Sequence, residues 1–293
     1  MAPSRRQRIL IVIAAMVGVV LVAAGSLLLY LTQADLGHHR GRVERFVSQA
    51  TGLRLEIAEL HVDLELRGAS ILEARDVSLT NPGFEPDSRL VVVDHLVLEI
   101  ELWSLLDNRI HVCSLEATGG EVFVRGDPEH GVNWVPHRHT PRVPRSGRVR
   151  VPAISINRGV LTSMSTTLDL PRLPRPLVIV ADRLEASTDP TDTVLLDLDG
   201  ELNGEALEIA GTAGPLAEMV VAGDIRPDLE IRLAEATASV AGRIGDLAHL
   251  TGAELEVQGA GPDVDRVTDM LGLPALGGGE FSRTADLTPV PEG

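Results

Sequence analysis

The sequence predicts a mainly β protein that is attached to a membrane by one N-terminal helix, and three observations support this prediction. Residues Ile9–Leu31 form a run without a charged side chain. From Leu53 onward, apolar and polar residues alternate with a period of two over most of the chain, which is typical of strands with one dry face. Gly, Pro and Asn interrupt this alternation repeatedly, as turns between antiparallel strands do.

The run Ile9–Leu31 is long enough to cross a bilayer. A helix of this length measures roughly 34 Å, against a hydrocarbon core of about 30 Å. The basic segment before the run and the small residues at Ala23-Ala24 also fit a cleaved signal peptide. Because the chain stays apolar beyond Ala24, we expect an uncleaved transmembrane helix at 9–31 behind a cytoplasmic tail at 1–8. Arg residues are equally numerous near both ends of the run, so the free amino group alone favours this orientation.

A short amphipathic helix is predicted directly after the anchor, within Leu36–Ala50. Val43, Phe46 and Val47 gather on one helical face, and Gly52 is expected to end the helix. The helix can pack on the next domain, or it can rest on the outer leaflet or close the end of a groove, and the pattern fits both.

Alternating strands fill the rest of the first predicted domain, residues 32–135. Leu53–Ile57, Leu60–Leu66 and Leu90–Leu102 each place apolar residues on one side and polar residues on the other. Asn81-Pro82-Gly83 predicts a turn. Gly119-Gly120 predicts a hairpin between strands at Ile110–Ala117 and Glu121–Arg125.

A Pro- and Arg-rich linker is predicted at residues 136–153, which have no apolar periodicity. It is expected to be solvated, or to contact an acidic surface or phosphate headgroups. The second region, 154–293, is predicted to be β-rich and to be incomplete at its C-terminal end. Hairpins are expected within Leu195–Gly211 and Val240–Gly259, a strand at Leu229–Leu233, and a helix at Asp263–Leu271 with Asp263 as N-cap.

The charge balance argues against nucleic acid as a partner. Three of the 26 Arg precede the apolar run, so the remainder carries 23 Arg against 42 Asp and Glu, a formal net charge of −19. The interior must be aliphatic, because only seven residues are aromatic. The single Cys113 cannot form an internal disulfide, and its apolar neighbours predict a buried small side chain.

The usual signatures of catalysis and cofactor binding are missing from the sequence. It contains no GxSxG, P-loop, HExxH, paired CxxC or dinucleotide-binding glycine pattern. His130, His137 and His139 lie in or near the linker, where solvation is the usual state of histidine. Asp197 and Asp199 share one strand face and are expected to be solvated. We therefore predict no catalytic residue, no metal site and no cofactor.

Several segments are similar to the AsmA family of bacterial envelope proteins. In the N-terminal part these are Asp76-Val77, Asn81-Pro82-Gly83-Phe84, the block Leu96–Leu115 and Gly131-Val132-Asn133-Trp134. In the second half the stretch Val240–Ser282 resembles the family as well. Together the similar segments cover nearly the whole chain after the anchor.

The resemblance implies an inner-membrane protein with most of its chain in the periplasm, involved in phospholipid transport and outer-membrane biogenesis. Members of the family are expected to form an elongated antiparallel β-groove that shields acyl chains, with few short helices. About 16 strands at roughly 4.8 Å each would make such a groove near 75 Å long. The partners implied are the inner membrane, phospholipids and other envelope proteins.

Two other functions remain open at this stage. The apolar strand faces can form the closed core of a β-sandwich in a structural or scaffolding ectodomain, or the chain can be an envelope enzyme with an unrecognised site. If the chain forms a lipid groove, one shared surface is expected to hold the following candidates: Leu55, Ile57, Val62, Leu64, Leu96, Leu98 and Ile100.

Overall fold

The computed structural model describes most of the chain after residue 51. The described residues are 41, 44, 45, 48, 52–63, 65, 68–84, 88–101, 103–104, 109–127, 131–134, 153–171, 173–216, 219, 224–246, 251–275 and 277–287. The predicted anchor at 9–31, Leu64 and nearly all of the 136–153 linker lie outside these residues. None of the helices in the described part is long and apolar enough to cross a membrane.

Fourteen strands in the described part belong to one large sheet. They are β1 (Arg54–Asp63), β2 (Ala69–Thr80), β3 (Arg89–Glu101), β4 (Arg109–Asp127), β5 (Gly131–Val132), β6 (Ala153–Ile156), β7 (Arg158–Asp169), β8 (Leu177–Thr188), β9 (Thr193–Leu202), β10 (Glu205–Pro215), β11 (Asp228–Leu233), β12 (Ala236–Asp246), β13 (Thr251–Gly261) and β14 (Phe281–Leu287). The mainly β prediction is therefore confirmed, with fourteen strands described instead of about 16.

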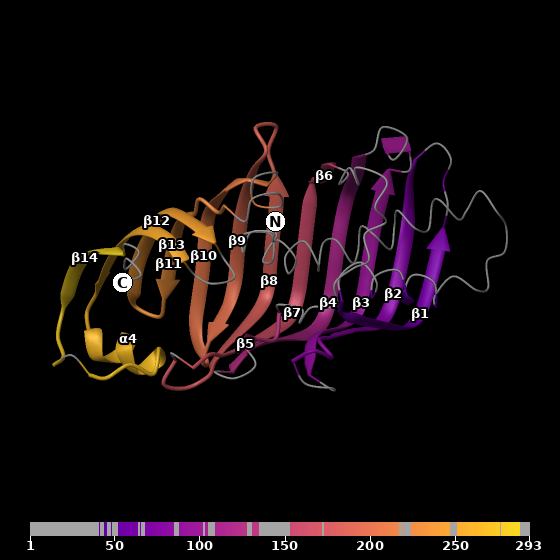
Figure 1. Cartoon of the computed structure of the whole chain (residues 1–293). Helices are drawn as coiled ribbons and strands as arrows, with labels where there is room; N and C mark the ends of the chain where they lie inside the picture. The colour runs from indigo at the N-terminus through magenta and orange to yellow at the C-terminus, as the bar shows by residue number, and fades with distance from the viewer. Residues whose placement is uncertain are drawn as a thin grey trace, which may run out of the picture.

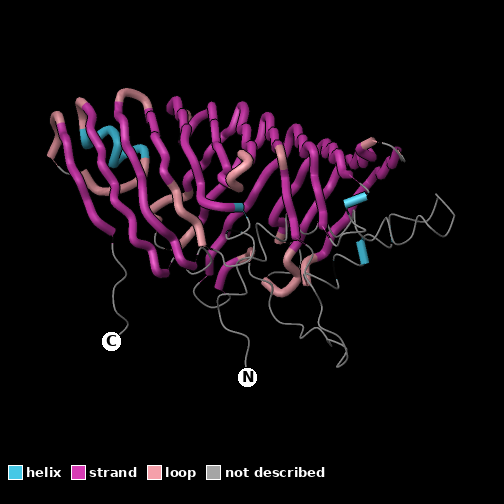
Figure 2. Tube along the Cα trace, turned by 90° about the horizontal axis from the view of Figure 1, so that it is seen from above, coloured by secondary structure: helices cyan, strands magenta, loops and turns pink. Residues whose placement is uncertain are grey.

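Twelve strands form a continuous path through the sheet. Their order is β1-β2-β3-β4-β7-β8-β9-β10-β11-β12-β13-β14, and β5 and β6 pair with β4 beside this path. The path runs along the molecule from β1 at one end to β14 at the other (Figure 1), and the strands follow one another in the same way when seen from above (Figure 2). At about 4.8 Å per step, twelve strands extend over roughly 53 Å.

The path through the sheet consists of two antiparallel meanders that meet at the parallel pair of β4 and β7. β4 and β7 run parallel, from Leu115 beside Gly159 to Arg125 beside Asp169. β6 also runs parallel to the first residues of β4. The predicted groove was antiparallel, and this pair departs from it because the chain returns to the beginning of β4 before β7 starts. The regions on the two sides of residues 136–153 thus contribute to one sheet.

The predicted hairpin across Gly119-Gly120 is wrong, because β4 is one continuous strand of 19 residues. Gly119 has φ +67°, and its pair with Asp94 is missing from the ladder although the register continues unchanged on both sides. A Cβ atom at Gly119 would come within 2.3 Å of a carboxylate oxygen of Asp94 on β3. Gly-Gly therefore permits a close approach between two strands here instead of reversing the chain.

This skipped pair belongs to a line of interruptions that crosses six neighbouring strands. At each of these residues the register skips one pair while the pairs on both sides continue. At each skipped position the apolar alternation shifts by one residue, so that apolar residues stay on the same face on both sides of the line. The residues in the line are Ala58, Asp76, Asp94, Gly119, Ser163 and Asp182.

The described helical residues agree with the predicted helices. Residues 41, 44, 45 and 48 are helical, and the Gly52 N–H donates to the Ser48 carbonyl at 3.0 Å with φ +78° at Gly52, as a terminating glycine does. The helix α4 (Val264–Met270) begins after Asp263, whose side chain accepts a hydrogen bond from the Asp265 N–H. Asp263 is therefore the N-cap that the sequence predicts.

Candidate functional site: the apolar face of the sheet

One face of the sheet carries an uninterrupted row of apolar residues from β1 to β14, here called the Leu98 row. Every member is the directly paired neighbour of the next, so all of them point to the same face. None of the twelve positions is polar. The row consists of Val62, Leu72, Leu98, Leu115, Gly159, Ala186, Leu196, Gly211, Leu229, Val240, Val257 and Ala285.

A second row, here called the Leu96 row, lies two residues further along each strand on the same face. It is apolar over eleven strands and ends in a charged residue, Arg283, on β14. Together the two rows make a stripe along the whole sheet. The row consists of Leu60, Ala74, Leu96, Ala117, Leu161, Leu184, Leu198, Ile209, Ile231, Ala238, Gly259 and Arg283.

The opposite face has a different composition. The row that begins at Glu59 is polar over ten strands and ends in Ala260 and Ser282. Its members are Glu59, Arg75, His95, Thr118, Thr162, Arg183, Asp199, Glu208, Arg232, Thr237, Ala260 and Ser282. The sheet therefore separates a polar, largely charged side from an aliphatic side from β1 to β12.

Six of the seven lipid-groove candidates lie on the apolar face and pack in one cluster. Leu55, Ile57, Leu98 and Ile100 are buried, and Val62 and Leu96 are partly buried against them. Leu64, the seventh, lies outside the described residues. The sequence therefore identified a shared surface, while its role in binding lipid stays a prediction.

The two halves of the apolar face differ in burial. In the first half Leu98 is only 1% exposed, and the cluster around it includes residues from β1 to β8. From β9 onward the stripe is half-buried, as at Leu196, Ile209, Leu229 and Ile231. Half-buried members such as Leu96 and Leu184 also occur in the first half, but every fully buried member of the stripe lies there, so from β9 onward the whole stripe stays partly in contact with solvent.

Two segments cover the margins of this half-buried stripe. At one margin, Met270 and Leu271 at the end of α4 pack on a cluster that contains Leu202, Leu207 and Leu233. At the other margin, Leu216, Met219 and Ile225 pack with Val194 and Ala213. The helix lies at the β14 end of the molecule in Figure 1. The stripe between the two margins forms a floor with apolar material on both sides.

Asn203 and Arg175 attach the end of α4 to the sheet. The Asn203 side-chain amide donates to the Met270 carbonyl at 2.7 Å, and Arg175 donates to the Asp269 carbonyl. Asn203 lies in the tight turn between β9 and β10, so the helix is held at the hairpin end of these strands. This margin is therefore defined by specific hydrogen bonds as well as by apolar contacts.

Two buried asparagines join the sequence segments that resemble the AsmA family. The Asn81 side-chain amide donates to the Asn133 carbonyl at 2.7 Å. The Asn133 side chain accepts from the Arg125 N–H at 2.8 Å and donates to the Phe123 carbonyl at 2.6 Å. Both residues are almost fully buried, so these bonds satisfy groups that water cannot reach. The sequence predicts a turn at Asn81 and shows Asn133 within a segment of the resemblance, but it contains no signal that the two segments meet.

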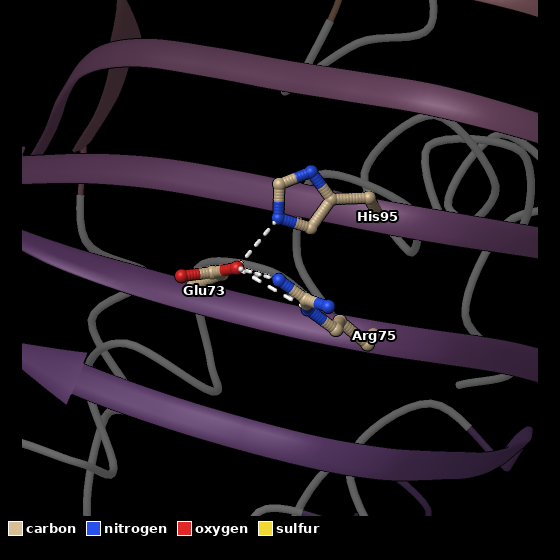
Figure 3. Close-up of polar contacts among 3 residues, drawn as sticks. All are labelled: Glu73, Arg75 and His95. Atoms are coloured by element: carbon tan, nitrogen blue, oxygen red, sulfur yellow. Dashed lines mark hydrogen bonds and ion pairs between the residues drawn. The ribbon is translucent and has the colours of Figure 1, made fainter.

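The charged face carries ion-pair clusters rather than a concave catalytic arrangement. Figure 3 shows Glu73 of β2 between His95 of β3 and Arg75 of β2. The His95 Nε2 atom lies 2.8 Å from Glu73 Oε1, and Arg75 Nη2 donates to the same oxygen at 3.0 Å. These hydrogen bonds, that of His95 first, lower the pKa of Glu73. The group stays ionised near neutral pH and is a poor general base.

A similar cluster surrounds Glu185 of β8. Arg158 of β7 donates to one carboxylate oxygen and Arg183 to the other, each at 2.8 Å. The hydrogen bond from Arg158, followed by that from Arg183, lowers the pKa of Glu185 to about 2. Asp197 and Asp199, which the sequence places on a solvated face, are exposed on the neighbouring strand β9.

His111 connects three segments where the two meanders meet. Its Nδ1 lies 2.8 Å from Glu101 of β3, and its Nε2 lies 3.0 Å from the Asn157 side-chain oxygen between β6 and β7. These contacts, that with Asn157 first, raise the pKa of His111. Cys113 on the same strand is half-buried, and burial raises the pKa of its thiol, with Glu101 and Glu99 adding to the effect. The thiol stays protonated and is a weak nucleophile.

Among the described residues, no three His, Cys, Asp or Glu side chains come close enough together to hold a metal ion. His130, His137 and His139 lie outside the described residues. Neither protein-family models nor curated proteins matched this sequence. The membership in the AsmA family therefore stays a prediction from the residues named above.

Proposed function

We propose that this protein is an AsmA-like, inner-membrane-anchored protein that shields phospholipid acyl chains on the apolar face of its sheet. Residues 9–31 would anchor it, and the sheet would lie in the periplasm, where it takes part in phospholipid transport and envelope biogenesis. The observation that carries the proposal is the pair of apolar rows that continues from strand to strand through the whole sheet. An isolated domain has no need of a twelve-strand stripe of which one half stays in contact with solvent.

The half-buried part of the stripe, from β9 to β13, is the proposed place of contact with acyl chains. Methylene groups gain about 0.8 kcal/mol each on leaving water, so aliphatic surface such as Leu229 and Ile231 favours them without any polar partner. The charged opposite face keeps the sheet soluble on its other side. The tightly packed first half would then serve as a rigid support.

The competing function, a scaffold with a closed β-sandwich core, requires a second sheet on the apolar face. In the described part of the chain all strands belong to one sheet. Within the described residues, α4 and the segment near Met219 cover the stripe from β9 to β13 at its margins. This open arrangement favours the lipid-binding proposal.

A pair of matched variants tests the proposal. Ile231→Glu places a carboxylate on the half-buried stripe, and Thr237→Glu places one on the exposed polar face of the next strand. The full chain is expressed in a Gram-negative host and purified in mild detergent, and the co-purified phospholipid is measured by mass spectrometry. We expect Ile231→Glu to lower the phospholipid per chain several-fold, because it places a charge on the stripe, while Thr237→Glu leaves it unchanged. Both variants keep the same anchor, so the comparison reports on the stripe alone.

Circular dichroism shows whether Ile231→Glu remains folded. A folded Ile231→Glu protein that retains the wild-type amount of phospholipid contradicts the proposal. Incubation with labelled phospholipid vesicles addresses the enzyme alternative. Transfer of intact lipid supports a carrier, whereas release of fatty acid or headgroup by the wild-type protein would favour an enzyme.

A further inference from the structure

The two edges of the sheet are not equivalent. At the β1 edge, the Ile57 N–H donates to Oε1 of Glu44 at 3.0 Å, so that a side chain of the preceding helical segment occupies a backbone donor of the edge strand. At the other end, β14 pairs with β13 from Gly261 beside Phe281 to Leu255 beside Leu287. Within the described part of the chain, the other edge of β14 has no hydrogen-bond partner.

The side chains of β14 are exposed on both faces of the sheet. Ser282 and Thr284 on the polar face and Arg283 and Ala285 on the apolar face are all exposed. Proline residues and β-bulges usually protect an edge strand from further pairing. β14 contains no proline, and its pairing with β13 contains no bulge. Arg283 is the one charge on its apolar face among the described side chains, and its long side chain can reach solvent beside a small neighbour.

We propose that β14 pairs with β14 of a second copy of this chain, antiparallel and about a twofold axis perpendicular to the sheet. Because Glu44 occupies one backbone donor of the β1 edge, head-to-tail pairing of β14 with β1 would have to displace this contact, whereas the pairing of like edges displaces none and closes after two copies. If the whole strand pairs, Thr284 lies opposite Thr284 and Arg283 lies opposite Ala285, so the two arginines do not face each other directly.

This axis keeps the two apolar faces on the same side of the joined sheet. In this register Ala285, the last residue of the Leu98 row, lies opposite Arg283, the last residue of the Leu96 row of the other copy, so the two stripes would join into one of twice the length. The pairing itself depends only on the free backbone of β14. It therefore does not rest on the proposed binding of lipid.

Disulfide trapping tests the pairing directly. In a Cys113→Ala background, Thr284→Cys would place two cysteines opposite each other, with Cα atoms about 4.5–5.5 Å apart, within the range that a disulfide spans. Thr237→Cys is the matched control, because it is exposed on the same face of an inner strand. On mild oxidation of the full chain in detergent, we expect a covalent dimer from Thr284→Cys and little from Thr237→Cys.

Proline substitution provides a second measurement. Successive residues of a strand direct their N–H groups to opposite edges, so one of Arg283→Pro and Thr284→Pro removes a donor from the free edge and spares the pairing with β13. We expect that variant to remain folded and to shift the protein from dimer to monomer in light scattering. A wild-type protein that is monomeric at micromolar concentration, or equal cross-linking of both cysteine variants, overturns the proposal.

Discussion

At the scale of single residues, burial separates the apolar side chains of the two faces. Leu98 belongs to the apolar face of β3 and is 1% exposed, whereas Leu195 lies on β9 with its side chain 46% exposed. The alternation in the sequence predicts that both leucines lie in strands. Only the contacts of neighbouring strands determine which of them supports the core.

This difference leads to a stability prediction. Leu98→Ala removes buried methyl groups and leaves a cavity, so we expect it to lower the free energy of unfolding by about 2–5 kcal/mol. Leu195→Ala removes the same atoms from an exposed site and should cost less than about 1 kcal/mol. Urea unfolding of the full chain in detergent measures both, and equal losses would show that the core does not include Leu98.

His111 gives the joint between the two meanders a dependence on pH. Its pKa in the folded state lies above the ordinary value of 6.5, because it contacts Asn157 and Glu101. A group with a raised folded-state pKa contributes stability that is fully present below its unfolded pKa and is lost as the pH rises through the folded value. Acidification to below pH 6.5 should therefore strengthen this joint.

The corresponding experiment compares the wild-type protein with His111→Asn across the pH range. We expect the stability difference between the two proteins to be largest below pH 6.5 and to shrink at higher pH. His61→Asn is the control, because His61 is an exposed histidine on the polar face of β1, away from the joint. A difference that stays constant with pH would exclude a contribution from protonation of His111.

At the scale of strands, glycines on the apolar face set how closely neighbouring backbones approach. Gly211 of β10 has φ +148°, and a Cβ atom there would lie 2.2 Å from the Asp228 carbonyl oxygen of β11. Gly159 of β7 belongs to the same Leu98 row, but the nearest atom to its added Cβ is 4.0 Å away. The two glycines therefore have different functions in the sheet, although they share one row.

We expect Gly211→Ala to destabilise the protein by more than about 1 kcal/mol, because the backbone of β10 or β11 must move. Gly159→Ala should be neutral or stabilising by up to about 1 kcal/mol, since it only restricts the unfolded chain. Thermal unfolding of the two variants provides the comparison. A neutral Gly211→Ala would show that the strands can separate there without cost.

The strands themselves could largely be predicted from the sequence, because a period of two reports a face directly. The positions of β3, β11 and α4 and the turn at Asn81-Pro82-Gly83 follow from local patterns. The hairpin at Gly119-Gly120 was mispredicted because Gly-Gly fits a turn and a close approach between strands equally well, and the approach to Asp94 depends on a strand that is distant in sequence. The parallel pairing of β4 with β7 joins residues on both sides of the linker, which no local pattern can report.

The candidate site was predictable in part for the same reason. Alternation showed that Leu96, Leu98 and Ile100 share a face, and the structure places them in one cluster. It did not show which members of the stripe are fully buried, or that none of them is buried from β9 onward. Burial depends on which segments cover the margins, and α4 and Met219 come from other parts of the chain.

At the scale of the whole molecule, the succession of neighbouring strands has a consequence for folding. Each strand of the path pairs with the next strand in sequence, except where β4 pairs with β6 and β7. Each meander can therefore grow by adding hairpins one at a time, at little cost in chain entropy, whereas the joint must close a loop that includes residues 135–152. Stability in such an array is close to a sum of nearest-neighbour terms, so the molecule should lose its strands from the ends inward and separate into two parts at β4 and β7.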